Sequence, residues 1–239
     1  MDFIRLVCLA LTAFALTAAP ARAQPQASVV VELYTSQGCA SCGRANGLLG
    51  DLARQPDVVA LTFPVDYWDY LGWRDTFAQS QFTARQRAYL RALRSRALYT
   101  PQVIVNGAYN ANAARPQRVR EALAAARAAQ PIAAPSVTLT QTNEDTAALR
   151  IGRGPAPREP ADVWVATYLP GPVNVLVTAG ENAGHRVGHY NIVRRLVRVG
   201  AWDGDAIAFD AVPCRPECAV LVQAPRGGPV YAAARVRQP

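Results

Sequence analysis

Residues 29–42 read Val-Val-Val-Glu-Leu-Tyr-Thr-Ser-Gln-Gly-Cys-Ala-Ser-Cys, and the predicted fold is built around this stretch. Its first half is a run of apolar, largely β-branched residues, which is typical of a buried strand. Gly38 and its polar neighbours then turn the chain. Beyond Cys42 the apolar residues recur at helical spacing. The sequence therefore predicts a strand, a short loop and a helix, with Cys39 and Cys42 at the start of the helix.

Cys39 and Cys42 form a C-x-x-C pair. Two intervening residues let one helical turn bring the sulfurs together, so that they can form and reopen a disulfide. Free N–H groups and the helix dipole favour a thiolate at this position. We expect Cys39 to be the accessible nucleophile and Cys42 to resolve the mixed disulfide. The same spacing also suits half a zinc site or a structural disulfide, although the strand–turn–helix context favours redox use.

A proline precedes a second apolar stretch, because residues 99–107 read Tyr-Thr-Pro-Gln-Val-Ile-Val-Asn-Gly. This stretch resembles the cis-proline loop of the thioredoxin superfamily, and residues 33–42 resemble its glutaredoxin branch. The resemblance implies a cis Thr100–Pro101 bond facing the sulfurs. It also implies that Pro101 shapes a groove and that the backbone near Thr100 pairs with an extended peptide. An ordinary trans proline that opens a strand is the alternative.

Residues 35–42, 65–73 and 99–102 together resemble the secreted thioredoxin-like family DUF1223. The resemblance covers nearly the whole mature chain. We therefore expect an α/β thioredoxin-like domain at residues 24–131, with a helical insertion at residues 66–98. The function of that family is poorly defined, so the resemblance implies a fold more than a chemistry.

The composition of the chain changes between Pro131 and Pro135. Upstream, strand and helix patterns alternate, whereas downstream short β-rich runs follow one another, separated by Gly, Pro, Asn and Asp. We therefore expect a smaller antiparallel β-sandwich domain at residues 135–239. Cys214 and Cys218 lie in this part, and we expect them to form a structural disulfide because they are close in sequence.

Residues 1–23 have the pattern of a secretory signal peptide. The apolar run at residues 6–18 is too short for a stable membrane span, and Ala-Arg-Ala at residues 21–23 fits a cleavage site. Cleavage would remove Cys8 and leave four cysteines, an even number that suits an oxidising compartment. We expect a periplasmic or secreted protein with no stable membrane span after cleavage.

The expected insertion at residues 66–98 begins with acidic and aromatic residues. Tyr67 and Trp68 can line a substrate groove beside the thiols, or they can anchor the insertion to the sheet, which is the commoner role of such clusters. Asp66 follows an expected strand at residues 58–65, whose end should lie near the active-site edge. This position makes Asp66 the candidate acid or base.

The net charge is +8, and every basic residue is an arginine. This pattern looks like compositional bias, and no nucleic-acid-binding motif accompanies it, so we expect no nucleic-acid partner. His185 and His189 are the two histidines of the chain. A metal could use them with Cys214 and Cys218, but nothing in the sequence brings the four together. We therefore expect neither a metal nor another cofactor.

Together these patterns predict an exported thiol–disulfide oxidoreductase that acts on protein thiols or disulfides. Two alternatives remain open. The first is a non-enzymatic periplasmic binding protein on the same scaffold, in which the disulfides are structural. The second is a metal- or copper-handling protein that uses its cysteines and histidines.

Overall fold

The computed structural model describes residues 29–129 and 133–236. The expected signal peptide at residues 1–23 lies outside these ranges. Within them the chain forms thirteen β-strands and three α-helices. No helix of the described part is long and apolar enough to cross a membrane.

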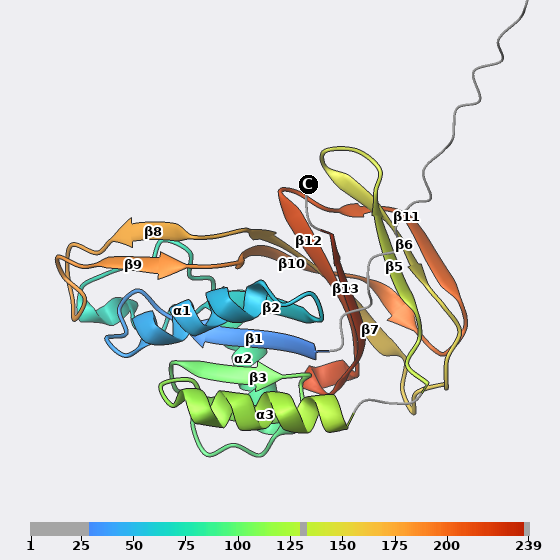
Figure 1. The fold of residues 1–239 in the computed structure, drawn as a ribbon, viewed down its shortest axis with the longest axis horizontal. Helices are drawn as coiled ribbons and strands as arrows, with labels where there is room; N and C mark the ends of the chain where they lie inside the picture. The colour runs from blue at the N-terminus through green and yellow to red at the C-terminus, as the bar shows by residue number, and fades with distance from the viewer. Residues whose placement is uncertain (1–28, 130–132, 237–239) are drawn as a thin grey trace, which may run out of the picture.

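A mixed eight-stranded sheet organises the molecule, in the order β13-β12-β7-β10-β2-β1-β3-β4 (Figure 1). At its centre β1 pairs in parallel with β2 and antiparallel with β3. The strands of this sheet are β1 (Val29–Thr35), β2 (Val58–Pro64), β3 (Gln102–Val105), β4 (Tyr109–Asn112), β7 (Ala161–Leu169), β10 (Ile192–Trp202), β12 (Glu217–Gln223) and β13 (Val230–Val236).

This sheet shows that the expected fold class is wrong. We expected an α/β thioredoxin-like domain with a helical insertion, followed by a smaller antiparallel β-sandwich domain. Instead the protein is mostly β, and four strands from each half of the chain form one sheet. The two halves join where β10 meets β2: Thr62 donates its backbone N–H to the Asn191 carbonyl (2.9 Å) and its hydroxyl to the Tyr190 carbonyl (2.6 Å). Sequence patterns predict strands but not their partners across more than 100 residues.

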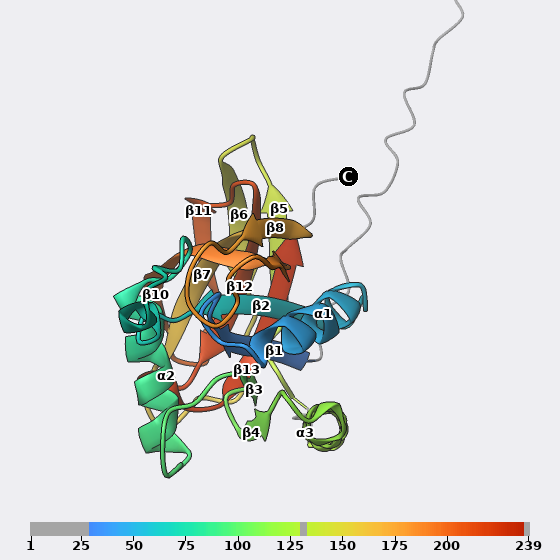
Figure 2. The same cartoon turned by 90° about the vertical axis from the view of Figure 1, so that its left-hand side faces the viewer.

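Three helices cover the N-terminal half of the sheet: α1 (Cys42–Ala53), α2 (Ser80–Ala92) and α3 (Pro116–Ala128). Figure 2 shows α1 and α3 on one face and α2 on the other. Successive side chains of a strand point to opposite faces, so β1 contributes side chains to the apolar cores on both faces of the sheet. Val31 and Leu33 pack in the α1–α3 core, while Val30 and Tyr34 pack in the core beneath α2.

Two smaller sheets complete the fold. β5 (Val137–Gln141), β6 (Thr146–Ile151) and β11 (Ile207–Pro213) form a sheet in the order β11-β6-β5, which packs on the C-terminal half of the large sheet through a shared apolar core. β8 (Val173–Leu176) and β9 (Arg186–His189) form a two-stranded hairpin that extends beside α1 (Figure 1). Two short 3-10 helices, η1 (Asp69–Leu71) and η2 (Pro225–Gly227), lie in the connections.

Candidate functional site

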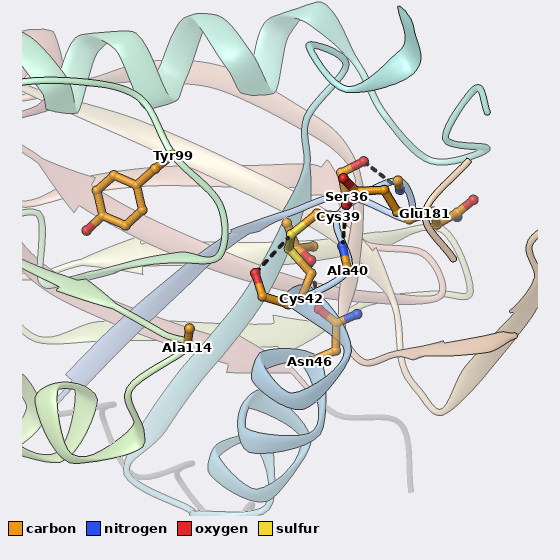
Figure 3. Close-up of a disulfide and its surroundings, with 12 residues drawn as sticks. Ser36, Cys39, Ala40, Cys42, Asn46, Tyr99, Ala114 and Glu181 are labelled. Carbon is orange, nitrogen blue, oxygen red and sulfur yellow. Dashed lines mark hydrogen bonds between the residues drawn. A yellow bond between two sulfur atoms is a disulfide. The ribbon is translucent and has the colours of Figure 1, made fainter. Parts of the chain in front are cut away.

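The Cys39–Cys42 pair lies where the sequence predicts it, between the end of β1 and the first residue of α1. The two residues form a disulfide with an S–S distance of 2.16 Å and a Cα–Cα distance of 5.4 Å (Figure 3). The loop before them is held by Cys39 N–H donating to the Ser36 carbonyl (3.2 Å) and by Gly38 N–H donating to the Ser36 hydroxyl (3.0 Å). The predicted strand–turn–helix arrangement is therefore confirmed.

Both cysteines are buried in the disulfide form. Cys39 is 1% exposed and Cys42 is 0% exposed, so the expected difference in accessibility between them is not seen in this state. The two residues between them, Ala40 and Ser41, are exposed. The Ser41 hydroxyl lies 3.6 Å from the Cys39 sulfur. A hydroxyl in this place can donate a hydrogen bond to a Cys39 thiolate when the pair is reduced.

Pro101 lies at the same end of the sheet as the C-terminal end of β1. Strand β3 runs antiparallel to β1 with Gln102 opposite Tyr34, which places Pro101 beside the residue that ends β1, Thr35. The Thr100–Pro101 bond is cis, as the resemblance implies, and Pro101 is buried. The hydroxyl of Thr100 is buried and has no hydrogen-bond partner in residues 29–129 and 133–236.

Trp68 lies next to residues 36–41, the cysteine loop, and both Trp68 and its neighbour Tyr67 contact the core. A β-carbon built on Gly38 would lie 3.4 Å from the β-carbon of Trp68. The two rings are 6.5 Å apart, and both pack against the core beneath α2. Burial raises the pKa of Tyr67 to about 12, so its phenol stays protonated at neutral pH. The Trp68 indole N–H is buried and has no partner in the described part of the chain.

A buried carboxylate that contacts the cysteine loop belongs to Asp75, which the sequence did not single out for this role. Asp66 is half-buried and accepts a hydrogen bond from the Thr83 hydroxyl of α2 (2.5 Å). Asp75 is buried and accepts from the Gln37 N–H (2.7 Å) and the Phe77 N–H (2.8 Å). Burial raises its pKa. The Phe77 contact is a local turn, but no sequence pattern indicates a partner 38 residues away.

His189 is a second buried group that the sequence did not assign. Its Nδ1 lies 3.3 Å from the side-chain amide nitrogen of Asn46, which is four residues after Cys42 on the same buried face of α1. The Asn46 side-chain oxygen accepts from the Thr35 hydroxyl (2.9 Å). Nε2 of His189 is buried and unpartnered among the described residues, and burial lowers the pKa of this imidazole to about 4. A neutral imidazole therefore contacts Asn46, which lies one helical turn after Cys42.

The second cysteine pair is joined as expected. Cys214 and Cys218 form a disulfide (S–S 1.93 Å) and are fully buried in the core between the three-stranded sheet and the large sheet. His185 is exposed, whereas His189 is buried. Residues 29–129 and 133–236 contain no cluster of three or more His, Cys, Asp or Glu side chains placed to hold a metal ion. The four residues of the metal alternative thus do not form one site.

The fold and this site define a mixed-sheet protein with a C-x-x-C disulfide at the start of its first helix. This arrangement is compatible with redox use. Residues 30–223 match the model of a family described as a protein of unknown function, DUF1223. The chain belongs to this family.

Two solved structures resemble the chain. One is the X-ray crystal structure of a protein from Agrobacterium tumefaciens, with 33% sequence identity and a TM-score of 0.73, covering 90% of this chain and 96% of that one. The other is HBP35 of Porphyromonas gingivalis, with 15% identity and a TM-score of 0.58, covering 88% of this chain and 75% of that one. At 15% identity the second likeness concerns the fold alone. No curated protein matches the chain.

Proposed function

We propose that the protein exchanges thiols and disulfides with protein partners through Cys39 and Cys42. The observation that carries the proposal is the disulfide at the start of α1, with the Ser41 hydroxyl 3.6 Å from the Cys39 sulfur. A structural disulfide has no need of a hydrogen-bond donor beside one sulfur. A nucleophilic thiolate is stabilised by one.

The reaction conserves atoms and electrons. In the oxidation of the reduced pair, the Cys39 thiolate attacks a partner disulfide, one partner sulfur leaves as a thiolate, and a mixed disulfide forms. The Cys42 thiolate then attacks Cys39, which closes the Cys39–Cys42 bond and releases the second partner sulfur. Two electrons pass to the partner, and its thiolates take up protons. The same steps in reverse order oxidise a partner dithiol.

The proposal places the partner peptide between the proline loop and Trp68, which lie beside the end of β1 and the cysteine loop. Thr100 and Trp68 each carry a buried polar hydrogen without a partner in the described residues, which a peptide group could satisfy once the atoms that cover it move aside. Pro101 offers no backbone N–H that would compete for the partner sulfur. Tyr67 supplies a neutral aromatic surface beside Trp68.

An acid–base role for Asp66 has less support, because the Thr83 hydroxyl engages its carboxylate (2.5 Å). Asp75 and His189 are better placed, since Asp75 bonds to the Gln37 N–H and His189 lies beside Asn46. Either group could take up or release a proton near the pair.

We also propose that the protein works in the periplasm or is secreted, which its two disulfides support. Mass spectrometry of the exported protein tests this location. A mature chain that begins at Gln24 supports it, whereas a mature chain that retains Cys8 contradicts it.

One observation favours the second candidate, a binding protein whose disulfides are structural: both sulfur-bearing residues are almost completely buried. The reduction potential of Cys39–Cys42 separates the two candidates. Exchange proteins have potentials of about −270 to −120 mV, whereas structural disulfides lie below about −300 mV. Cys214–Cys218 is the reference within the same molecule. A Cys39–Cys42 potential as low as that of the reference would contradict exchange.

A further inference from the structure

The loop between β8 and β9 reaches the cysteine loop. The two strands pair only with each other in the described sheets, and the hairpin lies beside α1 (Figures 1 and 2). The side-chain amide of Asn182 donates to the Gln37 carbonyl (2.8 Å) and to the Cys39 carbonyl (3.1 Å). One side chain of this loop thus bridges the two ends of the turn that presents Cys39.

Glu181, the neighbour of Asn182, makes a second contact with the same turn. Its carboxylate accepts a hydrogen bond from the Ala40 N–H (3.3 Å; Figure 3). Helix α1 has no acidic residue in its first turn, so Glu181 brings a negative charge close to that end from another element. The carboxylate therefore lies where it would oppose a developing thiolate on Cys39.

The loop also reaches the segment that carries the aromatic residues. A β-carbon built on Gly180 would lie 3.3 Å from the Leu71 carbonyl oxygen and 3.6 Å from the β-carbon of Trp73. Residues 177–185 thus span from the cysteine loop to η1. The loop thus ties the turn that carries Cys39, which is buried although its neighbours Ala40 and Ser41 are exposed, to the segment that carries η1.

Backbone hydrogen bonds hold the loop at its base, next to β8 and β9, and its tip at residues 181 and 182 contacts the cysteine loop through side chains. Val177 is buried, donates its N–H to the His185 carbonyl (3.0 Å) and accepts from the Gly184 N–H (2.8 Å). Gly180 and Gly184 have φ values of +73° and +80°, a region that glycine adopts at little cost. At the tip, exposed Glu181 and half-exposed Asn182 hold the cysteine loop by side-chain hydrogen bonds. Such bonds contribute little net stability each, so the tip can open without unfolding of the hairpin.

We propose that residues 177–185 form a strap that closes over the Cys39–Cys42 disulfide. The strap must release the contacts of Asn182 and Glu181 before another sulfur can reach Cys39. Opening would also move the Glu181 carboxylate away and so favour a Cys39 thiolate. The inference deepens the proposed exchange function and rests on it for its biological purpose, but its test requires no physiological partner.

The test measures the rate at which dithiothreitol reduces each disulfide of the folded protein. Two electrons and two protons pass from the dithiol to the cysteine pair, and alkylation followed by peptide mass spectrometry reports each pair separately. Asn182→Ala should accelerate reduction of Cys39–Cys42 about tenfold, since two hydrogen bonds of the closed strap are lost. Glu181→Ala, at an exposed position, should accelerate it by a smaller factor.

Two controls make the result specific. Asn174→Ala replaces an exposed asparagine of β8 in the same hairpin and should leave the rate unchanged. The reduction rate of Cys214–Cys218 reports any loss of structure in the whole protein. This rate should be the same in every variant. Unchanged Cys39–Cys42 rates in Asn182→Ala and Glu181→Ala would overturn the strap, and so would equal acceleration of both disulfides. Faster reduction of Cys39–Cys42 alone supports the strap even if no partner is ever trapped on Cys39, so the two proposals can fail independently.

Discussion

Glu32 and Arg85 form a buried ion pair that fastens α2 to the central strand of the sheet. The guanidinium donates to both carboxylate oxygens, at 2.7 and 2.8 Å, and the two side chains are 1% and 8% exposed. Tyr34 and Tyr89 donate their hydroxyls to the same carboxylate (2.9 and 2.5 Å). Arg85 also donates to the side-chain oxygen of Gln223 in β12 (2.8 Å). The pair therefore connects α2 to both halves of the chain.

Replacing Arg85 should destabilise the protein strongly. Arg85→Ala leaves the Glu32 carboxylate buried without its cation, which typically costs about 3–5 kcal/mol. Urea unfolding measures the loss, with Arg87→Ala as the control because Arg87 is an exposed arginine of the same helix. A loss below about 1 kcal/mol for Arg85→Ala would mean that the pair does not fasten the helix.

The buried imidazole of His189 should make stability depend on pH. Its pKa falls from 6.5 to about 4 because of burial. Above pH 6.5 neither the folded nor the unfolded imidazole is charged. Between pH 6.5 and 4 the unfolded imidazole binds a proton that the folded one does not, so the free energy of unfolding falls as the pH falls, by about 3 kcal/mol in total.

Urea unfolding at pH 7, 5.5 and 4 checks this dependence. His189→Gln should lose less stability over that range than the wild-type protein, whatever its stability at pH 7. His185→Gln, a replacement of the exposed histidine, should follow the wild-type curve. Parallel curves for His189→Gln and the wild type would show that His189 does not cause the acid sensitivity.

The sequence predicted local structure well and long-range pairing poorly. The strand–turn–helix around Cys39 and the disulfide between Cys214 and Cys218 are present, and so is the cis bond before Pro101 that the resemblance implies. Each depends on residues close together in the chain. The fold class was wrong because β10 pairs with β2 through Ile192 and Thr62, a contact between distant strands that their apolar patterns do not specify.

The same limit applies to the site. Asp75 and Asn182 contact the cysteine loop from 38 and 145 residues away, and neither position has a motif that indicates its partner. Glu32 is the one acidic residue of the apolar run that predicts β1, and its partner Arg85 is one of several arginines in the expected helical insertion at residues 66–98. Amphipathic spacing indicates which face of a helix is apolar, but it cannot distinguish a buried arginine from its exposed neighbours.

Removing the Ser41 hydroxyl should make Cys39 less reactive. In the reduced protein this hydroxyl can donate a hydrogen bond to the Cys39 thiolate, since the two atoms lie 3.6 Å apart in the disulfide form. Ser41→Ala should therefore slow alkylation of Cys39 at pH 7 about threefold. Ser80→Ala is the control, because Ser80 is an exposed serine at the start of α2 and makes none of the contacts of the cysteine loop in the described part of the chain. Equal rates for Ser41→Ala and the wild type would exclude an activating role for Ser41.

Removing the second disulfide should reduce stability and leave exchange intact. Cys214 and Cys218 close a short loop, so the double replacement by alanine should cost about 2 kcal/mol from the lost chain constraint, and more from the cavity it leaves. Urea unfolding measures the loss, and dithiothreitol reduction of Cys39–Cys42 should keep its wild-type rate. A changed rate would indicate that the two disulfides are coupled.

Partner trapping through Cys39 tests whether the protein exchanges disulfides with other proteins. In cells that express Cys42→Ser, the resolving thiol is absent, so mixed disulfides between Cys39 and partner proteins should accumulate, and non-reducing gels should show them as bands that vanish on reduction. The double replacement Cys39→Ser/Cys42→Ser should show none. If Cys42→Ser captures no more protein than the double replacement, Cys39 does not exchange disulfides with partners, and the binding-protein account replaces this one.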